Sequence, residues 1–391
     1  MRRPLPALFV TVFATATVAG LLLLAPRVLR AADPPATSGG AASPDSAHRP
    51  HAELGFDVKR VAPAVYAVIR RNPPGFLFDC NSGFVVGRDG VLVIDAQFTT
   101  KSANEVIVAM RRITKKPVLY VVNTHSHDDH ISGNQAYRAE WPGVKFVAHV
   151  ETAKDMTTGY LERRKQLAEA IPGATAAFRG ALSANRGSDG KPLAADQWVR
   201  LENDVALGEE YAAEARDFRL QSPDLTLTDS LRLPLGDRDV MVRFLGRAHS
   251  AGDVVVQLRQ PDVVFSGDLV VWPVPLAGTT SFPLEYAATL QKLKALPHAT
   301  LVPGHGPVMF DDTYLDLMIG LMGAIRDQTQ AAVARGDSLG ALRQGLDLEK
   351  YRAAICGDGK VKNMLFNGYV VMPGVQRAYE QASAAASTGS H

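Results

Sequence analysis

The stretch THSHDDH at residues 124–130 decides the fold of this chain. It directly follows Pro117–Val122, a near-continuous apolar run that predicts a buried strand. Residues two apart in an extended segment point to the same side, so His125 and His127 are expected to project together from the end of that strand. The stretch therefore predicts a cluster of polar side chains at a strand end.

Asp129 and His130 add two more ligand-type groups where the next helix is expected to begin. In a shuffled chain with 10 His, the spacing His-x-His-x-Asp-His would arise on the order of 10⁻⁴–10⁻³ times. Imidazole and carboxylate together suit Zn²⁺ and similar divalent ions. The alternatives are an active-site loop without metal and histidines that cap a helix; four such residues at this spacing favour a metal site.

The composition around this stretch is that of a globular protein with a real core. The chain has 391 residues, 46% hydrophobic residues, a net charge of +2 and 2 Cys. These values exclude a disordered chain, a disulfide scaffold and a dedicated nucleic-acid binder. The length predicts one large domain with additions, or two domains.

The N-terminus indicates export. Residues 1–31 have a cationic start, an uncharged apolar stretch at 7–25 and a small-residue cleavage site, which together predict a secretory signal peptide. The apolar stretch is almost long enough to span a bilayer, so an uncleaved membrane anchor is the alternative. We therefore expect a periplasmic or secreted protein. Residues 32–52, which follow the leader and are rich in Ala, Pro, Ser and Gly, are predicted to be a disordered linker.

Strands and helices alternate over residues 53–310, which predicts a layered α/β domain. Residues 151–228 interrupt the alternation with helix-favouring stretches and are predicted to be an insertion that either forms a lid or is purely structural. Residues 311–391 are predicted to be a helical extension with a disordered tail.

The polar stretch and four later landmarks resemble the metallo-β-lactamase superfamily of dinuclear metal hydrolases. The later landmarks are Asp95 at an early strand end, and the segments 246–253 (GRAHSAGD), 265–268 (FSGD) and 303–306 (PGHG). The resemblance implies a four-layer αββα sandwich. It implies one metal ion on His125, His127 and His249, a second on Asp129, His130 and His305, Asp268 as the bridge, and Asp95 in support behind them.

Two divalent ions, zinc first and iron or manganese as alternatives, are thus the expected cofactors. A metal-bound hydroxide would be the nucleophile, with Asp129 and Asp268 as the catalytic carboxylates. Two such ions, both carboxylates and hydroxide sum to a charge of +1, which predicts a small anionic substrate with a carboxylate, phosphate or sulfate near the scissile group. The predicted reaction is hydrolysis of an ester, thioester, lactam or phosphate-type bond.

Three further side chains are weaker candidates for the pocket. His149 ends an expected strand and either touches substrate or is a structural histidine. Trp272 and Phe282 flank a loop after Asp268 and either line the pocket mouth or pack in the core. Export would permit a disulfide between Cys80 and Cys356, against buried free thiols as the alternative.

The alternative functions are a β-lactamase, an iron-dependent redox or dioxygenase enzyme on the same fold, and a non-catalytic metal-binding protein. A β-lactamase is disfavoured because those of the superfamily usually have Cys or Ser where this chain has Asp268. Iron redox chemistry is disfavoured because the diiron branch usually has Glu where this chain has His127. A non-catalytic metal-binding protein is disfavoured because the ligand set is complete. We expect a small-molecule substrate, no nucleic-acid partner and no membrane contact beyond the possible anchor; the oligomeric state is not predicted.

Overall fold

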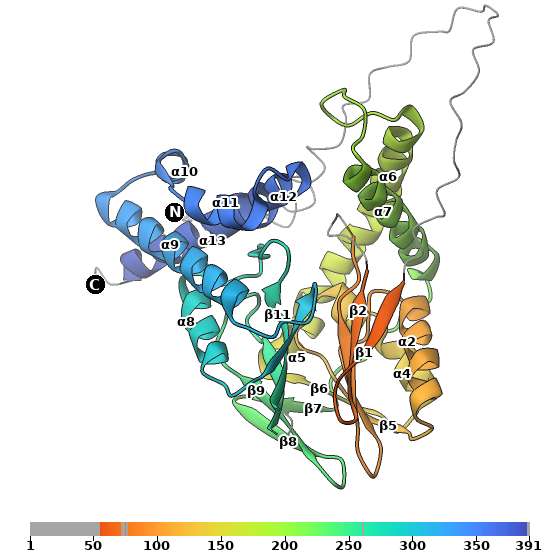
Figure 1. Ribbon diagram of the computed structural model, residues 1–391. Coiled ribbons are helices and arrows are strands. Elements are labelled where there is room, and N and C mark those ends of the chain that lie inside the picture. Colours follow the sequence, from red (N-terminus) through yellow and green to blue (C-terminus); the bar gives the residue numbers. More distant parts are fainter. Residues whose placement is uncertain (1–54, 72–74, 76, 260–261, 389–391) are drawn as a thin grey trace, which may run out of the picture.

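The computed structural model describes residues 55–71, 75, 77–259 and 262–388. Two β-sheets lie face to face, and helices cover the outer face of each (Figure 1). The four-layer αββα sandwich implied by the sequence is therefore confirmed. The leader, the possible anchor at 7–25 and the linker at 32–52 lie outside the described residues. Among the helices that are described, none is both long and apolar enough to cross a membrane.

The first sheet has seven strands in the order of the chain, antiparallel from β1 to β4 and parallel from β4 to β7. Its strands are β1 (Phe56–Ala62), β2 (Val65–Arg70), β3 (Ser82–Val86), β4 (Val91–Ile94), β5 (Val118–Val122), β6 (Lys145–His149) and β7 (Leu225–Leu227). The second sheet has the order β12-β11-β10-β9-β8 and is antiparallel except between β11 and β12. Its strands are β8 (Ser230–Pro234), β9 (Asp239–Phe244), β10 (Val254–Arg259), β11 (Asp262–Val271) and β12 (Thr300–His305).

Helices form the two outer layers and two groups near one end of the sandwich (Figure 1). Those before the second sheet are α2 (Thr100–Ile113), α3 (Asp128–Ile131), α4 (Asn134–Glu140), α5 (Val150–Thr158), α6 (Tyr160–Ala184) and α7 (Ala195–Glu214). The rest are α8 (Pro283–Lys294), α9 (Thr313–Arg335), α10 (Leu339–Gly345), α11 (Glu349–Cys356), α12 (Lys360–Leu365), the π-helix η1 (Phe366–Val371) and α13 (Met372–Thr388).

Apolar residues on both faces of the strands form three hydrophobic cores, one between the two sheets and one on the outer face of each sheet. Side chains such as Val242, Val256 and Val302 meet Leu92 and Val122 between the two sheets and are almost completely buried. The outer face of the first sheet packs on α2 and α4, and the outer face of the second packs on α8, α9 and α13. Each sheet is buried on both faces, so the polar residues at its strand ends are held on a rigid frame.

One boundary differs from that expected from the sequence. Residues 151–228 are helical through α5, α6 and α7, but Leu225–Leu227 form β7 and extend the first sheet beside β6. The described part of the C-terminal extension, residues 311–388, is helical from α9 to α13. Buried α9 side chains such as Leu321 and Ile325 belong to the same core as Val255 and Leu301 of the second sheet.

Candidate metal centre

The candidate metal ligands come from strand ends and the loops that follow them. β5 is buried between β4 and β6, and the chain leaves it at Asn123 to present His125 and His127 before α3 begins at Asp128. Asp268 lies within β11, and His305 is the last residue of the parallel neighbour β12. His249 follows β9. Segments distant in sequence thus meet at one edge of the two sheets, as parallel neighbours allow.

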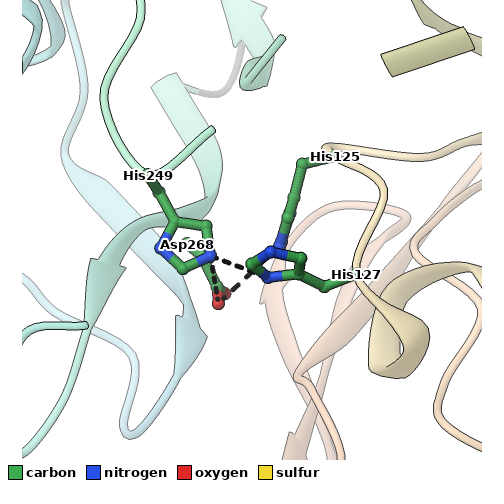
Figure 2. Close-up of side chains that lie close together, drawn as sticks. All are labelled: His125, His127, His249 and Asp268. Atoms are coloured by element: carbon green, nitrogen blue, oxygen red, sulfur yellow. Dashed lines mark hydrogen bonds and ion pairs between the residues drawn. The ribbon is translucent and has the colours of Figure 1, made fainter. Parts of the chain in front are cut away.

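The first ligand group comprises His125, His127, His249 and Asp268, whose ligand atoms all lie within 4.8 Å of one another. Figure 2 shows these four side chains pointing toward a common point. His127 Nδ1 is 2.9 Å from His249 Nε2, and Asp268 Oδ2 is 3.5 Å from the same His249 atom and 3.9 Å from His125 Nε2. Three imidazoles and a carboxylate are a ligand set that zinc accepts.

The second ligand group comprises Asp129, His130 and His305. Asp129 Oδ2 is 3.1 Å from His305 Nε2 and 3.3 Å from His130 Nε2. Asp268 Oδ1 faces this group, 3.3 Å from His130 Nε2 and 3.4 Å from His305 Nε2. Asp268 thus turns one oxygen to each group, so the structure brings the seven side chains together in the two sets that the resemblance implies.

Hydrogen bonds behind the rings fix how they face the site. Asp95, at the end of β4, lies with Oδ2 2.9 Å from His130 Nδ1, and its other oxygen accepts a hydrogen bond from the backbone N–H of Thr124 at 2.8 Å. His249 Nδ1 lies 3.0 Å from the carbonyl oxygen of Leu276. Since each of these ring nitrogens donates to an oxygen, the opposite nitrogen, Nε2, turns its lone pair toward the centre.

Several buried ligand atoms have no hydrogen-bond partner within the described part of the chain. They are His125 Nε2, His130 Nε2, His305 Nε2 and Asp268 Oδ1. An unpaired buried polar atom costs about 1–3 kcal/mol. Four that converge on one small volume fit a cation, which accepts lone pairs from all of them, so the donor set fits the divalent metal ions of the resemblance.

The pKa shifts at the centre have the same origin. Burial lowers the pKa of His127, and the neighbouring His249 lowers it further, to about 3. Burial also disfavours a charged His305, but the carboxylates of Asp268 and Asp129 outweigh it and raise the pKa of that ring to about 9. Burial thus favours an uncharged His127 ring, whose lone pair can bind a cation, while the carboxylates of Asp268 and Asp129 favour positive charge beside His305.

A buried ion pair fixes the ligand loop from behind, and sequence reasoning missed it. Asp128, between two ligand residues, accepts hydrogen bonds from Arg164 and Tyr160 of α6, the latter at 2.9 Å. The Arg164 guanidinium also lies over the rings of Tyr211 and Phe218, at 4.4 and 3.5 Å from their centroids. The helical insertion thus holds the metal-binding loop through a charged contact.

A glycine lets β12 approach the bridging carboxylate closely. A Cβ atom on Gly304 would lie 2.0 Å from Asp268 Oδ1 and 2.9 Å from the backbone nitrogen of Asp268. No side chain fits there. Gly304 therefore allows His305 and Asp268 to share one site.

A cavity of about 310 Å³ opens onto the centre at His127, Asp129 and Asp268. Its walls are largely apolar, with Phe78, Leu167 and Leu276 among them. A smaller cavity adjoins it through Ser126 and Thr280, and Phe282 lines that second cavity.

The other sequence candidates are not members of the ligand groups. Trp272 donates its backbone N–H to the carbonyl oxygen of His305 at 3.1 Å and lines another cavity on the far side of that histidine. His149 is structural, since its Nε2 lies 3.0 Å from the carbonyl oxygen of Thr228, its Nδ1 caps α5, and its ring stacks on Phe244. Cys80 and Cys356 are free buried thiols, so the disulfide alternative is wrong.

Comparisons with known proteins identify the fold and its relatives. The family model described as the metallo-beta-lactamase superfamily matches residues 75–305. The linear primary-alkylsulfatase from Pseudomonas sp. (strain ATCC 19151) is 27% identical over 231 residues, which is 56% of this chain and 40% of that protein. This chain therefore spans well under half the length of that relative.

Two solved structures are similar to this chain. The stereoselective inverting sec-alkylsulfatase from Pseudomonas sp. aligns with a TM-score of 0.55 and 15% identity, over 83% of this chain and 50% of that one. The metallo-beta-lactamase from Pontibacter korlensis aligns with a TM-score of 0.47 and 20% identity, over 68% of this chain and 99% of that one. At 15% identity, the likeness to the sec-alkylsulfatase shows a common fold.

Proposed function

Because the chain belongs to the metallo-beta-lactamase superfamily and is a metallo-hydrolase, we propose that it holds two zinc ions and hydrolyses sulfate esters of small, largely apolar alcohols. The observation that carries the proposal is the convergence of the unpartnered atoms His125 Nε2, His130 Nε2, His305 Nε2 and Asp268 Oδ1. In the proposal, His125, His127 and His249 hold one ion, and Asp129, His130 and His305 hold the other. Asp268 lies between them.

When bound, two such ions lower the pKa of a shared water toward neutrality and stabilise negative charge that develops on the substrate. The chain's own groups do the rest. Asp129, whose carboxylate is partly exposed and lines the cavity, accepts a hydrogen bond from the attacking water and orients it. Asp95 and the carbonyl of Leu276 keep the rings of His130 and His249 aligned throughout.

Two features support a sulfate ester as the substrate. Two divalent ions against the carboxylates of Asp129 and Asp268 leave net positive charge, which favours a substrate with an anionic group at the reacting centre. The apolar walls of the cavity, Phe78, Leu167 and Leu276, fit the carbon chain of an alcohol. Hydrolysis converts R–O–SO₃⁻ and water to R–OH and hydrogen sulfate. The name of the primary-alkylsulfatase relative points to the same ester class.

The test is a substrate panel on zinc-loaded protein. Sulfate release from octyl sulfate is compared with turnover of 4-nitrophenyl acetate, 4-nitrophenyl phosphate and nitrocefin. We expect octyl sulfate to have the highest kcat/KM. Faster turnover of nitrocefin would replace the proposal with a β-lactamase, and faster turnover of the acetate or phosphate would replace the substrate class alone.

A matched pair of variants separates the centre from general effects on folding. Asp268→Asn removes the bridging charge and is expected to lower kcat/KM by at least about a hundredfold. His298→Gln is the control, because His298 lies outside both ligand groups and contacts Asp312, with its Nε2 3.1 Å from Oδ1 of that residue. We expect this variant to keep full activity. Equal activity of the two variants would refute the assignment of Asp268.

A further inference from the structure

We propose that the cavity beyond His305, lined by Phe78, Trp272 and Lys362, is a binding site for an aromatic anion such as an aryl sulfonate or aryl carboxylate. The cavity has a volume of about 420 Å³. It lies between the β1–β2 edge of the first sheet, the ends of β11 and β12, and α12. Its size is within the range of small-ligand sites.

The aromatic character of the site comes from Trp272. Its side chain is 39% exposed, although it is one of the largest apolar groups of the chain. One side of the indole packs on the backbone of Gly306, where a Cβ atom would come within 3.2 Å of the ring. The Lys362 ammonium lies 5.7 Å from the ring centroid. The ammonium lies over the ring in this structure, so a flat ligand ring stacks on the indole when the Lys362 side chain turns aside and places its charge beside the ligand's anionic group.

The charges around the cavity favour an anion. The cations that line it are Lys59, Arg71 and Lys362, and the acids are Asp196 and Asp79. Asp79 is paired to Arg70, and Arg71 is paired to Asp57, each at 3.5 Å, which leaves Lys59 and Lys362 against Asp196. Arg70 itself is only 7% exposed, and its Nη1 has no hydrogen-bond partner among the described residues. Cations therefore exceed free acids around the aromatic surface, and a carboxylate or sulfonate matches that excess.

The site adjoins the candidate metal centre but does not depend on it. Phe78 lines both cavities and meets the His305 ring edge-on, with centroids 4.5 Å apart. The groups that would bind the anion, Trp272 and Lys362, lie outside both ligand sets. The inference therefore goes beyond the proposed hydrolysis and does not require it to be correct.

Isothermal titration calorimetry of the full chain with 1-naphthalenesulfonate tests the site, with uncharged 1-naphthol as the comparison ligand. We expect the sulfonate to bind more tightly than the naphthol. Trp272→Leu should abolish measurable binding, and Lys362→Gln should weaken it about two- to fivefold, as expected for loss of one exposed cation. Lys360→Gln, on the same helix and outside the cavity, is the matched control and should leave binding unchanged.

Asp268→Ala separates this site from the metal centre, and its sulfonate affinity should equal that of the wild type. Loss of binding in Asp268→Ala with normal binding in Lys362→Gln would place the probe at the metal centre and overturn the proposal. Equal affinity of wild type, Trp272→Leu and Lys362→Gln would also overturn it, whatever the catalytic result.

Discussion

Replacing Arg164 by Met should destabilise the protein by removing the partner of Asp128. The side chains of Arg164 and Asp128 are only 8% and 15% exposed. Loss of one partner of a buried ion pair typically costs about 3–5 kcal/mol, because the other charge stays buried. Tyr160 and Ser132 still donate hydrogen bonds to Asp128, so we expect the lower end, about 3 kcal/mol.

The assay is urea unfolding of the zinc-loaded protein followed by circular dichroism. Arg163→Met is the matched control, because Arg163 is the next residue of the same helix, and its pair with Asp155 is 34% exposed on each side. An exposed pair of this kind is worth about 0–1 kcal/mol. The double variant Asp128→Asn/Arg164→Met should be more stable than the sum of its single changes predicts, by at least about 1 kcal/mol.

The same substitution should also weaken metal binding, since Asp128 lies between two proposed ligands. Zinc affinity is measured by competition with a chromogenic chelator. If Arg164→Met costs no more than Arg163→Met, and the double variant is strictly additive, the contact with the insertion does not hold the ligand loop and the reasoning is refuted.

Three further outcomes are expected. Asp95→Asn should lower zinc affinity about 10–100-fold, because it weakens the support of His130; unchanged affinity in chelator competition would contradict this role. Gly304→Ala should reduce bound zinc in elemental analysis, because its Cβ would clash with Asp268 Oδ1; a full zinc complement would show that the two strands can separate at no cost. Zinc at about 100 times its Kd should raise the thermal unfolding midpoint of chelator-treated protein by about 5 °C. A midpoint that does not change when zinc is added would argue against a zinc site that forms only in the folded state.

Part of the ligand grouping was predictable from local signals. Residues two apart at the end of an apolar strand point to the same side, so His125 and His127 could be placed together without a structure. The landmarks that the family shares supplied His249, Asp268 and His305. Asp268 lies in the second sheet, so the strand period alone does not place it beside His125.

Contacts between distant helices and strand ends were not predictable. The Asp128–Arg164 pair joins residues 36 apart, and Arg164 has the ordinary sequence surroundings of a solvated helix face. Likewise, the periodicity of apolar residues in the sequence does not show that α9 shares a core with the second sheet, or that Trp272 faces a cavity beyond His305. The helical pattern shows which face is apolar but not what that face will meet.

The most direct test of the central claim is the zinc stoichiometry of the purified chain, measured by elemental analysis after dialysis against zinc and then against metal-free buffer. Two ligand groups that share Asp268 predict two zinc ions per chain in the wild type and at most one in Asp268→Ala. A wild-type value of one ion or none, or a variant that retains both, would contradict the proposed dinuclear centre.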